Sequence, residues 1–175
     1  MKILHAINST NPAGGGPIES IVQAHLALKD KGHRLEAVCL DAPDSPWLRQ
    51  LPFTVHAMGP AATKYRYSSS YVPWLRQHAR EYDCVIVHGI WLFPSVGAWL
   101  GLRDSGTPYF VYSHGMLDPS FRRLFPLKHM AKANVLAMYA ILKERPDAIF
   151  IQSESTEYFH ADNPKAIKSA EFYNA

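Results

Sequence analysis

A run of three glycines stands between a short apolar stretch and a helical pattern, close to the start of the chain. The apolar stretch covers residues 2–7, the glycines are Gly14, Gly15 and Gly16, and Pro17 opens the expected helix. Glycine lets the backbone adopt positive φ and approach a ligand closely. The first helical turn points its free N–H groups and positive dipole end at the same place. This arrangement is typical of a phosphate or diphosphate cradle, so a nucleotide-using α/β protein is the leading hypothesis.

Strand-like apolar runs alternate with helical patterns along the chain. We expect strands at residues 2–7, 34–40, 53–58, 84–88, 109–113 and 148–152. We expect helices at residues 17–31, 70–81, 94–104 and 126–143, and a last one from about residue 153. Several strand runs lack polar alternation, as is usual when helices cover both faces of a sheet. The pattern predicts an α/β fold with a doubly wound, mostly parallel Rossmann-like sheet and helices on both faces.

Composition limits the classes of protein to which the chain can belong. Its 175 residues are enough for one well-buried domain and few for two. The net charge of +3 is too small to indicate nucleic acid, although it suits a phosphate-bearing ligand. Cys39 and Cys84 lie in apolar runs, which predicts buried free thiols. Because no apolar run could cross a bilayer, we expect a cytoplasmic protein, at most peripheral to the inner membrane face.

Polar residues follow the expected strands where ligands bind in such sheets, at the carboxyl ends. Asn8 follows the first strand, and two His-Gly pairs, at His88 and His114, follow the fourth and fifth. Two histidines at equivalent strand ends, each beside a glycine, favour a shared pocket over two structural histidines. His114 is suited to hydrogen bonding a phosphate or sugar hydroxyl, or to moving a proton near neutral pH. No third ligand stands at metal-binding spacing, so we expect no metal site.

Other interpretations of these segments are weaker. Glu19 stands where a dinucleotide-binding motif has its third glycine, and Asp41, which could imitate a ribose-binding carboxylate, sits in an acidic turn. No Gly-Lys-Ser/Thr follows the glycines, which excludes a P-loop. Residues 122–132 are basic with interleaved apolar residues, which indicates either a solvated helix start or a surface for an anionic acceptor or membrane. Glu154 and Glu157 are expected to face solvent rather than to form a catalytic pair.

Four motifs, in this order, resemble the amino-terminal domain of GT-B glycosyltransferases of family 4. They are the opening residues 1–5, the glycine loop with residues 17–19, residues 88–91 with Pro94 and Ser95, and residues 113–119. The resemblance covers about residues 1–145. Each motif is modest by itself, and together they are specific.

The resemblance implies two Rossmann-like domains around a cleft, and retaining transfer of a sugar from a nucleotide-sugar donor to a saccharide or lipid-linked acceptor. By position, Gly14, Gly15 and Gly16 would lie near the donor diphosphate, and His114 would be the catalytic residue beside the transferred sugar. The acceptor-binding residues would be Asn8, His88, Trp91, Asp118 and Arg122. No cofactor or essential divalent metal is expected. Backbone N–H groups and cationic side chains would stabilise the departing diphosphate instead.

The resemblance also predicts how the chain is organised. We expect residues 1–175 to be the acceptor-side domain, without the family's carboxy-terminal nucleotide-sugar domain and inactive without that domain or a complementary chain. Residues 145–175 also resemble a strand–helix piece of family 1 glycoside hydrolase relatives, but a retaining hydrolase needs carboxylates from separate strands about 5 Å apart. The alternative is a stand-alone Rossmann-like or flavodoxin-like module that binds a nucleotide or phosphate without transferase chemistry and forms homo-oligomers.

Overall fold

The computed structural model describes residues 1–114, 116 and 149–151. In this part of the chain six strands form one sheet, in the order β3-β2-β1-β4-β5-β6. Every neighbouring pair is parallel, which confirms the predicted Rossmann-like α/β fold. The strands are β1 (Lys2–Ala6), β2 (Arg34–Cys39), β3 (Thr54–Ala57), β4 (Cys84–His88), β5 (Tyr109–Tyr112) and β6 (Ile149–Ile151). The helices expected at residues 126–143 and from residue 153 lie outside the described residues.

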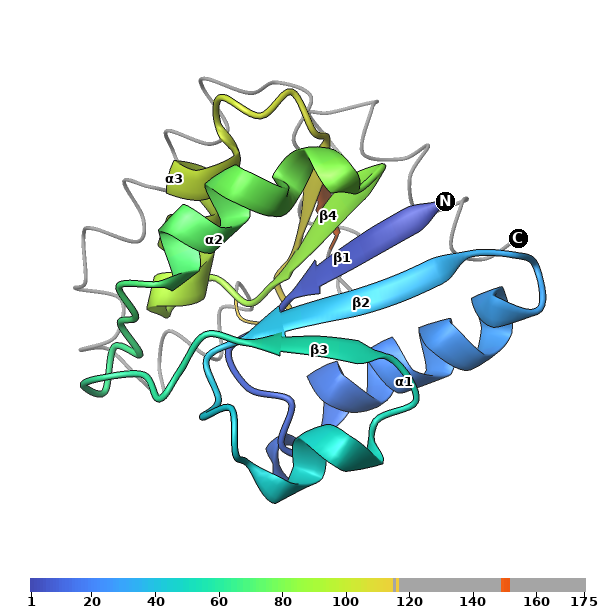
Figure 1. Cartoon of the computed structure of the whole chain (residues 1–175), viewed down its shortest axis with the longest axis horizontal. Helices are drawn as coiled ribbons and strands as arrows, with labels where there is room; N and C mark the ends of the chain where they lie inside the picture. The colour runs from blue at the N-terminus through green and yellow to red at the C-terminus, as the bar shows by residue number, and fades with distance from the viewer. Residues whose placement is uncertain (115, 117–148, 152–175) are drawn as a thin grey trace.

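Helices cover both faces of the sheet (Figure 1). One face carries α1 (Gly16–Lys29), and the other carries α2 (Tyr71–His78) and α3 (Phe93–Leu102). The chain starts at β1 and runs outwards through β2 and β3, and then returns to β4 on the other side of β1. This reversal creates a switch point between β1 and β4, where the connections leave the sheet in opposite directions.

Successive side chains of a strand point to opposite faces of the sheet, so the core has one layer on each face. Leu4 and Ala6 of β1 pack with α2 and α3, whereas Ile7, just beyond β1, packs with Ile18 and Ile21 of α1. The predicted free thiols are confirmed, because both cysteines are buried and unpaired.

Two glycines allow α2 and α3 to pack closely. A Cβ on Gly97 would lie 2.8 Å from the Tyr71 ring, and one on Gly101 would lie 2.7 Å from Leu75. Both distances are shorter than real Cβ contacts, so any larger residue would push the two helices apart.

The structure differs from the sequence-based elements in its short helices. The helix expected over residues 70–81 ends at His78 and continues as a 3₁₀ turn, η3 (Ala79–Glu81), because the Ala79 carbonyl accepts hydrogen bonds from Tyr82 N–H and the Thr107 hydroxyl. Two further 3₁₀ helices, η1 (Pro12–Gly14) and η2 (Pro46–Gln50), were not expected. Each begins with proline, whose fixed φ suits a helix start, but three to five residues show no periodicity.

Glu36 places a carboxylate inside the sheet, where it is only 3% exposed. It accepts hydrogen bonds from the Tyr82 hydroxyl at 2.7 Å and from His56 at 2.8 Å, and Arg34 lies 3.0 Å away. Burial alone would raise the pKa of Glu36. The hydrogen bonds from His56 and Tyr82 and the charge of Lys2 outweigh that effect and hold the pKa below its ordinary value of 4.5.

We expect Glu36→Gln to lower the free energy of unfolding by about 2 kcal/mol at neutral pH, because it removes charge-assisted hydrogen bonds from a buried site. The pKa is lower in the folded state, so the contribution is complete above pH 4.5 and is lost as the pH falls below it. Urea unfolding at a series of pH values measures both effects. Glu19→Gln on the exposed side of α1 is the matched control and should change little. A wild-type advantage that stays constant down to about pH 3 would contradict this role.

Candidate functional site

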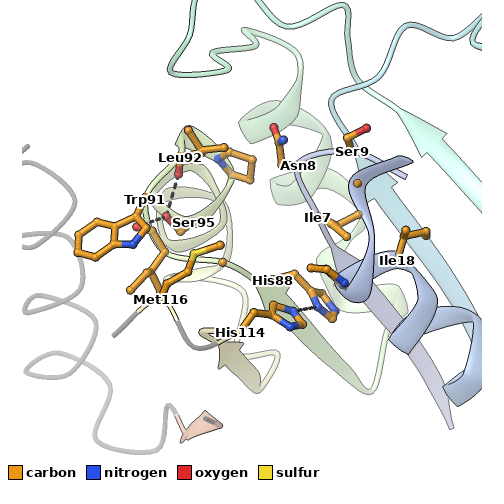
Figure 2. A pocket seen from close by; sticks show the side chains of 15 residues that line it. Ile7, Asn8, Ser9, Ile18, His88, Trp91, Leu92, Ser95, His114 and Met116 are labelled. Atoms are coloured by element: carbon orange, nitrogen blue, oxygen red, sulfur yellow. Dashed lines mark hydrogen bonds between the residues drawn. The ribbon is translucent and has the colours of Figure 1, made fainter. Parts of the chain in front are cut away.

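A cavity of about 180 Å³ opens at the carboxyl ends of β1, β4 and β5 (Figure 2). This is the edge of the sheet at which ligands bind in doubly wound folds, next to the switch point. Its lining residues are Ile7, Asn8, Ser9, Gly14, Pro17, Ile18, His88, Gly89, Ile90, Trp91, Leu92, Pro94, Ser95, His114 and Met116.

The lining is apolar with a few polar groups. Among the described residues the lining consists mostly of isoleucines and prolines, with Trp91, Leu92 and Met116, and it includes no lysine, arginine, aspartate or glutamate. The polar groups are the Asn8 amide, the Ser9 and Ser95 hydroxyls and two imidazoles. A wall of this kind suits a neutral molecule with an apolar face that is oriented by a small number of hydrogen bonds.

The glycine run forms a bend at the rim of the cavity. Gly15 adopts φ of 77°, which a residue with a side chain rarely does, and Gly14 lines the cavity itself. Two of the three glycine N–H groups already have acceptors within η1: Gly14 donates to the Asn11 carbonyl at 2.8 Å, and Gly15 donates to that of Pro12 at 3.1 Å.

The first turn of α1 holds the remaining donors of the bend. The first bond back along the helix runs from Glu19 N–H to the Gly15 carbonyl at 3.4 Å. Gly16 and Ile18 therefore keep the free amides of this turn, since Pro17 has none. A Cβ on any of the three glycines would meet nothing within 4 Å. Among the residues of the bend and the first turn of α1, the amides of Gly16 and Ile18 are therefore the donors left for a ligand.

Asp41 fixes the segment between β1 and the bend. Its carboxylate accepts hydrogen bonds from the Ser9 hydroxyl at 2.6 Å, from Thr10 N–H at 2.7 Å and from the Thr10 hydroxyl at 2.9 Å. Burial alone would raise the pKa of Asp41, but the bonds from Ser9, Thr10 and Trp47 hold it below its ordinary value. The sequence suggested only an acidic turn here. The signal that was missed is the pairing of two strand ends: Asp41 follows β2, and Ser9 and Thr10 follow the neighbouring strand β1.

Asn8 is oriented by a residue from the long loop at residues 59–70. Arg66 donates from Nε to Asn8 Oδ1 at 3.0 Å and from its terminal nitrogen to the Leu40 carbonyl at 3.2 Å. Because the amide oxygen of Asn8 is engaged, its NH₂ group is the donor that remains for the cavity. Sequence reasoning gave Arg66 no role, because nothing in a loop pattern shows which strand end it will reach.

Three imidazoles lie in a row across the ends of β1, β4 and β5. His5 Nδ1 is 2.9 Å from His88 Nε2, and His88 Nδ1 is 2.7 Å from His114 Nε2 (Figure 2 shows the second contact). We call His5, His88 and His114 the histidine row. His5 was not among the predicted site residues. It pairs with Ile86 of β4, and residues two apart in a strand point to the same face, so His5 and His88 lie on one face of the sheet. Gly89 turns the backbone beside the row with φ of 84°.

The histidine row is neutral at physiological pH. Burial lowers the pKa of His5 from 6.5 to about 4, and it lowers that of His114 to about 4 as well. Burial, followed by the charges that His5 and His114 would carry, lowers the pKa of His88 well below its ordinary value. Each ring therefore holds one N–H donor and one lone-pair acceptor, as a neutral imidazole does.

The structure brings together most of the residues that the sequence selected. Asn8, Gly14, His88, Trp91 and His114 line the same cavity, and Gly15 and Gly16 lie in the adjoining bend. Asp118 and Arg122 lie outside the described residues. Within the described part of the chain, no group of three or more histidine, cysteine or acidic side chains could hold a metal ion, and no helix has the length and apolar character to span a membrane.

We expect the histidine row to make the fold sensitive to acid. Its pKa values are lower in the folded state than in the unfolded chain. The contribution of the neutral rings to the free energy of unfolding is therefore complete above pH 6.5 and decreases as the pH falls towards 4. For His5 alone the loss approaches about 3 kcal/mol. Urea unfolding between about pH 7 and pH 4.5 measures how steeply the free energy of unfolding depends on pH. This dependence should be shallower in His5→Leu and unchanged in His33→Leu. A stability that does not vary over this range would show that the three rings take up protons equally in the folded and unfolded states, and would contradict the lowered pKa values.

No curated protein matches the chain. Residues 15–164 match the family described as glycosyl transferase 4-like domain. The match includes the end of the glycine bend, α1, β4 with His88, and His114. It agrees with the parallel sheet and with the cavity at its carboxyl edge. The chain therefore belongs to the glycosyl transferase 4-like domain family.

Proposed function

We propose that the chain is the acceptor-side domain of a retaining glycosyltransferase of the GT-B type. It would bind a saccharide or lipid-linked acceptor, and a second Rossmann-like domain, or a complementary chain, would hold most of the nucleotide-sugar donor. The chain alone would turn over little or nothing. In this proposal the protein works in the cytoplasm, with peripheral membrane contact if its acceptor is lipid-linked, and no metal is essential for transfer.

The observation that carries the proposal is one cavity that contains a glycine bend, two imidazoles and an asparagine amide. Gly14, Asn8, His88 and His114 come from the ends of three different strands and line the same 180 Å³ space. The family match supports the type of chemistry, and the shared cavity supports our choice of its site on this domain.

The character of the lining supports a neutral acceptor rather than a diphosphate inside the cavity. A diphosphate carries a large negative charge, and the described residues that line the cavity include no cationic side chain. The apolar wall around Ile90 and Trp91 suits the apolar face of a sugar ring, and the Asn8 NH₂ and the imidazoles suit its hydroxyl groups. The donor diphosphate would then lie at the rim, next to the Gly16 and Ile18 amides and the positive end of α1.

In this arrangement His114 would act at the reacting centre. It lies at the cavity end of the histidine row, and its neutral ring can donate or accept a hydrogen bond at physiological pH. A hydrogen bond to a sugar hydroxyl that strengthens in the transition state would lower the barrier without a formal charge on the ring.

Titration calorimetry of the isolated chain with UDP-, GDP- and ADP-sugars tests the division of labour between domains. We expect weak or undetectable binding by this chain alone, because the part of the cavity lining that the structure describes offers the nucleotide few donors and no cation. Addition of a separately expressed carboxy-terminal domain of the family should restore binding. Tight binding by the chain alone would instead favour a stand-alone nucleotide-binding module.

A His114→Ala substitution tests the role of the ring. In an enzyme reconstituted with a second domain, we expect kcat to fall by about a hundredfold or more, with a much smaller effect on the free energy of unfolding. His33→Ala, at a partly exposed position away from the cavity, is the control and should leave kcat unchanged. Parallel losses of kcat and stability in His114→Ala would mean that the histidine is structural.

A further inference from the structure

The three rings of the histidine row are joined by two consecutive contacts of hydrogen-bond length. The ring planes are inclined by 32° between His5 and His88 and by 21° between His88 and His114, with centroids 5.2 and 5.0 Å apart. Each N···N contact needs one N–H group on one side and one lone pair on the other. Two protons or two lone pairs facing each other at 2.7–2.9 Å would leave buried polar atoms unsatisfied.

This requirement permits two arrangements of protons in a neutral row. If His5 carries its proton on Nδ1, it donates to His88 Nε2, and His88 must then donate from Nδ1 to His114 Nε2. His114 consequently also carries its proton on Nδ1. In the reverse arrangement all three rings carry their protons on Nε2, and Nδ1 of His114 is an acceptor. The tautomer of each ring thus determines that of the next.

We propose that His5 and His88 are positioning residues that share one tautomeric state with His114, and so set whether Nδ1 of His114 donates or accepts a hydrogen bond. Neither Nε2 of His5 nor Nδ1 of His114 is hydrogen bonded to another described residue, so no described partner fixes the row in one arrangement. A change from one arrangement to the other takes up a proton from water at one end, releases one at the other end and leaves the net charge unchanged.

The surroundings of the row favour neutral, coupled rings. Tyr112 of β5 lies beside the row. Its ring centroid is 6.1 Å from that of His88 and 4.6 Å from that of His114. Among the described residues, only burial and the imidazoles themselves shift the pKa values of the row. No carboxylate there holds His5 or His114 in one tautomer, unlike the many histidines whose second nitrogen is fixed by an acidic partner.

The significance of this coupling for sugar transfer rests on the proposed function. A sugar hydroxyl at His114 can serve either arrangement, because it both donates and accepts. An anionic phosphate oxygen only accepts, so it would select the arrangement in which all three protons lie on Nδ1. A ligand in the cavity would thereby determine the proton position on His5, which does not line the cavity.

Nitrogen-15 NMR of the whole chain, labelled at histidine, measures the tautomers directly at neutral pH. We expect the same ratio of Nδ1–H to Nε2–H at all three rings. His78 is an internal reference, because its Nδ1 lies 2.8 Å from the Trp74 carbonyl and must carry a proton. Opposite tautomers on neighbouring rings, or a His88 protonated on both nitrogens, would overturn the proposal. The measurement needs neither donor nor acceptor, so its failure is separate from a failure of the transferase proposal.

Substitutions then test the transmission through the row. In His88→Leu the middle ring is absent, and we expect the tautomer ratios of His5 and His114 to diverge by about fivefold or more. His33→Leu is the control and should leave the three ratios equal. His5→Leu provides a second test if His88→Leu does not fold: His88 and His114 should still match, at a ratio different from that of the wild type. An unchanged ratio at His114 in His5→Leu would show that each ring sets its own tautomer.

Discussion

The buried carboxylate of Asp41 determines where the rest of the site can lie. It accepts hydrogen bonds from Ser9 and from both the backbone and the hydroxyl of Thr10, so the chain that leaves β1 is held against the end of β2. A buried charge is costly unless it is surrounded by donors, and these bonds offset that cost. With this segment fixed, the following η1 turn places Gly14 at the cavity and aims the first turn of α1 at its rim.

The switch point between β1 and β4 supplies the second constraint. Because the connections from these strands leave on opposite faces, their carboxyl ends are free of covering chain, and side chains such as Asn8 and His88 can share a space. Because β1 and β4 are neighbours in the sheet, His5 and His88 lie within hydrogen-bond distance although they are 83 residues apart in sequence. The parallel register therefore builds the cavity and the histidine row together.

The sequence predicted the fold class and the placement of the cavity because both follow from local patterns. Apolar runs without alternation identified the strands, and the rule that ligands bind at the carboxyl ends of strands selected Asn8, His88 and His114. It could not predict η1, because three residues show no periodicity. The hydrogen bonds of Asp41 and Arg66 were also missed, since they depend on which strand ends become neighbours. His5 was hidden for the same reason: it looks like an interior strand residue until β4 is placed beside it.

Among the described residues, the cavity is lined by three pieces of chain that lie far apart: residues 7–18, residues 88–95, and His114 with Met116. Each piece lies at the end of a different strand, and β4 and β5 come later in the chain than β1, β2 and β3. Contacts of such long range are entropically expensive to close and form slowly during folding. A nascent polypeptide that had emerged only as far as β3 would already contain the glycine bend, but it would have no opposing wall. The cavity is therefore complete only when β4 has paired with β1 and β5 has paired with β4.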